Sequence, residues 1–162
     1  MTASVLDPVR TTFHAVATTV VPETASLDAA SWRELESRVE GMLAARPEPV
    51  RKQLVLFLRL IEWMPLLWHG QRFTRLAGER RHAVLKRLER DPRLLVRRGF
   101  WGLRTLVFLG YYTQPRVQAA LGYRAHPDGW QARRRSGEHA AVDLQPITLD
   151  IPVVGPPDAP GA

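Results

Sequence analysis

Apolar positions recur at helical spacing along the first three quarters of the chain and predict an all-α fold. A first helix is expected between the pair Asp7 and Pro8, which suits a helix start, and Pro22, which stops it. Ser31 and Glu34 have the spacing of a capping box, so a second amphipathic helix is expected to begin at Ser31.

A third helix is expected after Pro47, and residues 54–68 within it are apolar on nearly every face. A helix of this kind is either buried in a bundle or covered by another chain. Pro65 removes a backbone donor, so a kink or a helix end is expected near Glu62. Glu62 is expected to pair with Arg59 or to reach the surface.

Three further helices complete the pattern. They are expected over residues 78–90, 93–112 and 115–121, and Gly122 ends the last of them. The inward-facing side chains of the first of the three are expected to be Ala83, Val84, Leu85 and Leu88. The pattern therefore predicts a single helical bundle of about five or six helices over residues 1–123.

Residues 124–162 lose the helical periodicity. Six Pro and four Gly occur between Pro127 and Ala162, which excludes a long helix. Aliphatic side chains nevertheless stand among these helix breakers, and a purely solvated tail would have fewer of them. We therefore expect an extended, Pro-rich C-terminal arm that lies on its own domain or wraps around a partner protein.

Length and composition narrow the class of protein. The chain has 162 residues and no Cys, which excludes disulfide scaffolds, thiol catalysis, iron-sulfur clusters and cysteine-bound zinc. The longest stretch without a charged residue, 11–22, is shorter than the ~20 apolar residues of a membrane span. The start of the sequence shows neither an export signal nor a twin arginine, so a cytoplasmic location is expected.

The net charge of +7 is concentrated in the middle of the chain. Residues 51–135 contain 19 basic and five acidic residues, whereas the segments on either side are net acidic. Such a block could bind nucleic acid, an anionic membrane surface or an acidic partner. The acidic ends and the lack of a known nucleic-acid-binding pattern disfavour nucleic acid. A charge-driven binder remains an alternative, and it predicts salt-dependent retention on heparin or acidic vesicles.

No recognisable catalytic pattern accompanies these helices. The five His residues lack the spacing of a zinc site, and the sequence contains no nucleophile elbow, no dinucleotide-binding Gly pattern and no phosphate loop. An autonomous enzyme is therefore disfavoured. A helical domain that binds a small ligand is a second alternative, and it predicts saturable thermal stabilisation by a metabolite.

Three short segments point to a known family. They are FHAVATTVVP at 13–22, FTRLAGERRHAVLKRL at 73–88, and GYYTQPRVQAALGY at 110–123, which combines Gly-Tyr-Tyr, Pro and Gly-Tyr. In their order and approximate spacing, over about residues 10–125, the chain resembles the gluconate 2-dehydrogenase subunit 3 family of small helical subunits.

The resemblance implies a non-catalytic accessory subunit that binds and stabilises a large FAD-dependent oxidoreductase of the glucose-methanol-choline type. In that family the flavin, the catalytic histidine and the pocket for a sugar, alcohol or sterol-like substrate belong to the large subunit. We therefore expect no catalytic, cofactor-binding or metal-binding residue in this chain. FAD is expected on the partner, and peripheral membrane contact stays open. Exported members carry a twin-arginine signal, which the start of this sequence lacks.

Aromatic and arginine residues dominate binding hot spots, which singles out candidates for contact with the flavoprotein. We expect Tyr111, Tyr112, Pro115 and Tyr123 to form a rigid corner, from which the arm after Arg124 embraces the partner. The complete set of expected contact residues is Trp101, Tyr111, Tyr112, Pro115, Tyr123, Trp130, Leu149 and Ile151.

Overall fold

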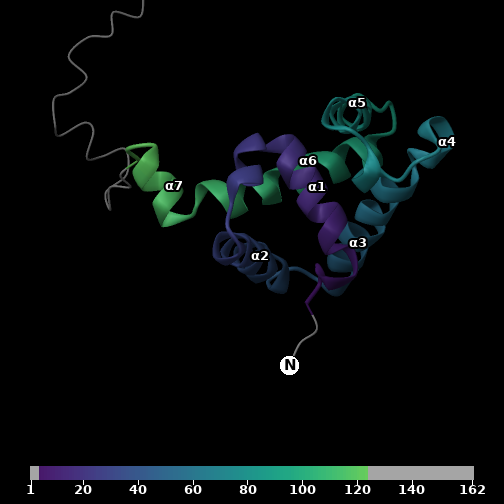
Figure 1. Ribbon diagram of the computed structural model, residues 1–162. Coiled ribbons are helices and arrows are strands. Elements are labelled where there is room, and N and C mark those ends of the chain that lie inside the picture. The colour runs from purple at the N-terminus through teal and green to yellow at the C-terminus, as the bar shows by residue number, and fades with distance from the viewer. Residues whose placement is uncertain (1–3, 124–162) are drawn as a thin grey trace, which may run out of the picture. The chain divides into compact units, whose positions relative to one another are not determined.

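The computed structural model describes residues 4–123, which form helices without a strand among them (Figure 1). In chain order, with η for 3-10 helices, the elements are η1 Asp7–Val9, α1 Arg10–Val20, η2 Pro22–Ser26, α2 Ala29–Ala44, α3 Glu48–Trp63, α4 Leu66–His69, η3 Phe73–Arg75, α5 Gly78–Glu89, α6 Leu94–Tyr112 and α7 Pro115–Ala120. The prediction of an all-α bundle is confirmed. The expected arm lies outside the described residues, and the division of the chain at residue 123 stays a prediction.

Helix boundaries follow from proline placement and capping, with one prediction wrong. The N-cap of α2 is Asp28, not Ser31, because the Asp28 carboxylate accepts a hydrogen bond from the Ser31 amide at 2.8 Å. Aspartate is a strong N-cap since it satisfies one of the free amides of the first turn. Ser31 instead lies buried inside that turn, where its hydroxyl also donates to Asp28.

The apolar third segment ends close to the predicted place. α3 stops at Trp63, and the short helix α4 follows Pro65 and is closed by Gly70, whose φ of 62° is left-handed. Such a backbone conformation favours glycine at a helix C-terminus.

In α5 the prediction for Ala83 was wrong, because Ala83 is exposed and only the other three expected side chains are buried.

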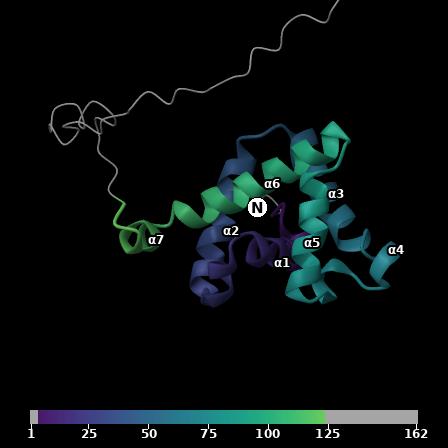
Figure 2. The ribbon, with the colours of Figure 1, turned by 90° about the horizontal axis from the view of Figure 1, so that it is seen from above.

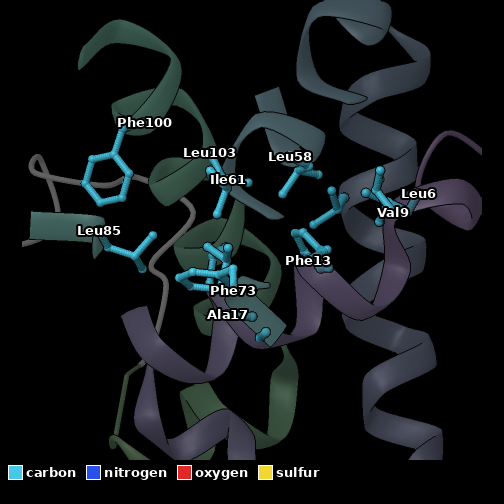
Figure 3. Packing of buried hydrophobic residues seen from close by; sticks show 14 of the residues in the cluster. Leu6, Val9, Phe13, Ala17, Leu58, Ile61, Phe73, Leu85, Phe100 and Leu103 are labelled. Atoms are coloured by element: carbon cyan, nitrogen blue, oxygen red, sulfur yellow. The ribbon is translucent and has the colours of Figure 1, made fainter. Parts of the chain in front are cut away.

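The core is built around α1. This helix contacts α3, α5, α6 and the 3-10 helices η2 and η3, and Phe13, Val16 and Ala17 on it are fully buried. Figure 3 shows side chains of α1, α3, η3, α5 and α6 pointing toward one another. The first helix of the sequence is therefore the centre of the packing.

The helices α2 and α6 approach closely because of Gly110. A Cβ atom built on Gly110 would lie 2.9 Å from Val39 Cγ2 and 3.3 Å from Leu35 Cδ2.

The helices α7 and α4 lie on opposite sides of the described region in both views (Figures 1 and 2). Within residues 4–123, no helix has the length and apolarity needed to cross a membrane.

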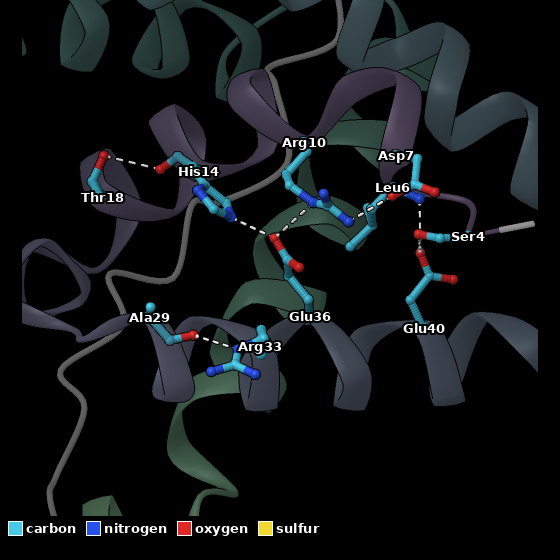
Figure 4. A network of polar contacts seen from close by, with 10 residues as sticks. All are labelled: Ser4, Leu6, Asp7, Arg10, His14, Thr18, Ala29, Arg33, Glu36 and Glu40. Carbon is cyan, nitrogen blue, oxygen red and sulfur yellow. Dashed lines mark hydrogen bonds and ion pairs between the residues drawn. The ribbon is translucent and has the colours of Figure 1, made fainter.

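Two carboxylates of α2 hold the beginning of the described chain (Figure 4). Glu40 accepts hydrogen bonds from the Ser4 hydroxyl at 2.6 Å and from the amides of Val5 and Leu6 at 3.1 and 2.7 Å. Glu36 contacts His14 Nε2 at 2.6 Å. Glu40 joins α2 to residues 4–6 and Glu36 joins it to α1, so both carboxylates are structural.

Glu62 is also structural; the predicted ion pair with Arg59 does not form, and the side chain is partly exposed. Its carboxylate accepts hydrogen bonds from the hydroxyl of Thr74 at 2.7 Å and from that of Thr12 at 3.2 Å. The Thr74 amide donates to it as well, at 3.3 Å. Glu62 therefore links α3 to α1 and η3.

Candidate partner-binding surfaces

A large groove lies between α2, α3 and α6, with a volume of about 1010 Å³. We call it the central groove; it is lined by Met42, Leu43, Ala45, Arg46, Val50, Gln53, Leu54, Phe57, Leu95, Arg98, Gly99, Gly102, Leu103, Thr105, Leu106 and Leu109. Most of these side chains are aliphatic or aromatic. The charged residues among them are Arg46 and Arg98.

Two glycines of α6 line the central groove. Gly99 and Gly102 are three residues apart and therefore share a helix face. A Cβ atom on Gly99 would lie 3.1 Å from the Phe57 ring, so α3 and α6 are in close contact there. A Cβ atom on Gly102 would meet nothing within 4 Å, so the space beside it is open.

The charge of the central groove is positive. None of the ion pairs formed within residues 4–123 involves Arg46 or Arg98. No acidic side chain lines the groove. An occupant with carboxylates beside apolar side chains would therefore match both its surface and its charge.

A second exposed surface lies where α3 and α4 meet α5. The Arg72 guanidinium lies 4.1 Å from the ring centre of Trp63, and the Arg87 guanidinium lies 4.3 Å from that of Trp68. Both tryptophans are about half exposed, and Leu67 between them is 81% exposed. Exposed tryptophans covered by arginines have the composition of a binding hot spot.

Tyr111 and Tyr112, two of the residues expected to form a corner, lie at the junction of α6 and α7. The rings of Tyr111 and Tyr112 meet edge to face with their centres 5.0 Å apart, and both line a hollow of about 370 Å³ between η2 and α7. Burial, with a smaller contribution from the Glu23 carboxylate, raises the pKa of Tyr111. Pro115 begins α7 directly after the corner.

A buried glutamine fixes this corner. Gln114 is fully buried, and its Nε2 donates to the Gly110 carbonyl at 3.2 Å. After α7, the Tyr123 amide donates to the Gln118 carbonyl at 2.8 Å, while the Tyr123 side chain is 60% exposed. Hydrogen bonds therefore form on both sides of Pro115, and the rigidity expected of the corner stays a prediction.

Of the other expected contact residues, Trp101 is described by the structure, and it does not lie beside the tyrosines. Trp101 is half exposed on α6, with the Arg104 guanidinium 5.3 Å from its ring centre, and it lines neither the central groove nor the hollow beside the tyrosines. Trp130, Leu149 and Ile151 lie outside the described residues. A partner-binding role for the whole set stays a prediction.

Sequence reasoning missed the central groove. Two signals could have indicated it: the apolar character of residues 54–68 on every face, and the glycines at 99 and 102 within a helix. Neither signal says which helix faces stay uncovered, because that depends on how α2, α3 and α6 are arranged in space. The structure adds that information.

The described chain lacks a group of side chains that could hold a metal ion, since no three His, Asp or Glu side chains gather within residues 4–123.

A family model described as gluconate 2-dehydrogenase subunit 3 matches residues 9–129. No curated protein and no solved structure matches the chain. The match covers most of the 162 residues and includes all three segments that carried the resemblance. The chain therefore belongs to the gluconate 2-dehydrogenase subunit 3 family.

Proposed function

We propose that the chain is a non-catalytic accessory subunit that binds and stabilises a large FAD-dependent oxidoreductase. The family match over residues 9–129 carries this proposal, because the family is described as a dehydrogenase subunit. In this proposal the flavin and the oxidation of a sugar, alcohol or sterol-like substrate belong to the large subunit. A cytoplasmic location remains a prediction from the sequence.

The exposed apolar surface of the described chain supports a binding role. Leu56 and Leu67 are 68% and 81% exposed, and the central groove adds a further apolar area. Monomeric soluble proteins rarely expose large contiguous apolar patches, and such patches often mark interaction sites. A large protein partner would remove this surface from water, which favours association.

The test is purification of the tagged protein from its native cell in moderate salt. We expect a larger chain to elute with it at fixed stoichiometry and to show flavin absorbance. The large subunit should unfold at a lower temperature when it is purified and heated alone than when it is heated in the complex, since binding of the small subunit stabilises its folded state. A colourless chain that elutes alone would contradict the proposal.

The same preparation separates the two alternatives. A charge-driven binder would be retained on heparin or acidic vesicles, and salt or charge reversal at Arg80, Arg81, Arg97 and Arg98 would release it. A small-ligand binder would be stabilised by a metabolite without any second protein. Either result, obtained with a lone chain, would replace the accessory-subunit proposal.

A further inference from the structure

We propose that the central groove binds an amphipathic segment of the flavoprotein, with carboxylates of that segment facing Arg46 and Arg98. This inference rests on the proposed function and adds which face of the small subunit is used and what kind of segment it takes. The argument comes from the shape of the groove, its charge and the open space beside Gly102.

The size of the groove suits a short piece of polypeptide. A helix that is ~10–12 Å across and rises ~1.5 Å per residue occupies roughly 120–170 Å³ per residue. The volume of about 1010 Å³ is therefore equivalent to roughly two helical turns. The apolar walls supplied by Leu54, Phe57 and Leu106 suit the buried face of an amphipathic helix, which is a common mode of recognition.

The charge of the groove selects among such segments. Its charged lining residues are two arginines, and in the described part of the chain neither has an acidic partner. A basic segment would be repelled, and a purely apolar one would desolvate a guanidinium without an acceptor, which is costly. A segment with carboxylates at its edges would form charge-assisted hydrogen bonds with Arg46 and Arg98.

Gly102 provides a test that does not depend on damage to the fold. Gly102→Leu starts its side chain in open groove space, because a Cβ atom there meets nothing within 4 Å, and replacing a helical glycine favours folding. The matched control is Gly41→Leu on α2, which is also an exposed helical glycine with nothing within 4 Å of its Cβ position and does not line the groove. The two variants should fold equally well and differ in binding.

The affinity of each full-length variant for the purified flavoprotein subunit would be measured by titration. We expect Gly102→Leu to bind at least tenfold more weakly and Gly41→Leu to bind like the original protein. The double variant Arg46→Glu, Arg98→Glu should also bind at least tenfold more weakly. If Gly102→Leu kept full affinity, the groove would not be the binding site and the inference would be overturned.

A photoreactive amino acid at position 102 would identify the occupant. The expected product joins position 102 to a segment of the flavoprotein in which apolar residues recur at helical spacing and are flanked by Asp or Glu. A product with a second copy of this chain, with its own residues 124–162, or with a bound small amphiphile would overturn the inference. Absence of any flavoprotein from the native complex would instead refute the proposed function, and the inference with it.

Discussion

The contact between α2 and α6 gives the sharpest prediction about stability. In Gly110→Ala the new methyl group would lie 2.9 Å from Val39 Cγ2 and 3.3 Å from two atoms of Leu35, inside a fully packed interface. Overpacking of a core costs ~1–3 kcal/mol. Replacing a helical glycine by alanine returns ~0.5–1 kcal/mol. The net effect expected is a loss of about 1 kcal/mol in the free energy of unfolding.

Gly102→Ala is the matched control, because the same substitution on the same helix meets nothing within 4 Å. It should raise the free energy of unfolding by ~0.5–1 kcal/mol. Urea unfolding followed by circular dichroism measures both variants, and the midpoint should move in opposite directions. If Gly110→Ala were as stable as Gly102→Ala, α2 and α6 would not approach as closely as described.

Three further predictions concern carboxylates. Glu40→Ala should lower the free energy of unfolding by ~1–3 kcal/mol, since it removes the acceptor for the chain segment before α1, and hydrogen exchange of the Leu6 amide should accelerate. Glu62→Ala should cost a similar ~1–3 kcal/mol in thermal unfolding, because buried Thr12 loses its acceptor, while Glu62→Gln should cost less. Hydrogen bonds from Ser31 lower the pKa of Asp28 in the folded protein. The ionised Asp28 carboxylate therefore stabilises the fold fully above the pKa of an unfolded-state Asp, about 3.9, and this stabilisation declines as the pH falls below that pKa. Acid titration of Asp28→Asn should show a smaller loss of stability over that range than the original protein.

The helical pattern was predictable because local signals agree with the tertiary structure. Proline at positions 22, 65 and 115 and glycine at 70 and 122 stand at helix ends, and backbone geometry alone requires this. The exception is the cap of α2, where Asp28 and Ser31 are both good capping residues and Asp28 takes the role through its hydrogen bond with the Ser31 amide.

The candidate site was predictable only in part. The corner at Tyr111 and Tyr112 follows from a helix end and a proline restart, which are visible in the sequence. The hydrogen-bond donors to the Glu62 carboxylate are Thr12 and Thr74, which lie on other segments of the chain. The sequence shows only neighbours of Glu62 such as Arg59, so the prediction of an ion pair with Arg59 was wrong. The central groove lies between three helices, and its existence depends on their arrangement in space, which no local sequence pattern specifies.

The central position of α1 has a consequence for how the chain folds. In the described chain α1 precedes α3, α5 and α6, the three helices that pack on it, and α5 and α6 follow α1 at a large sequence separation. Contacts of high sequence separation close slowly, because the intervening chain must be ordered first. The apolar face of α1 around Phe13 is therefore covered completely only when α5 and α6 have been made, and until then part of it is open to chaperone binding.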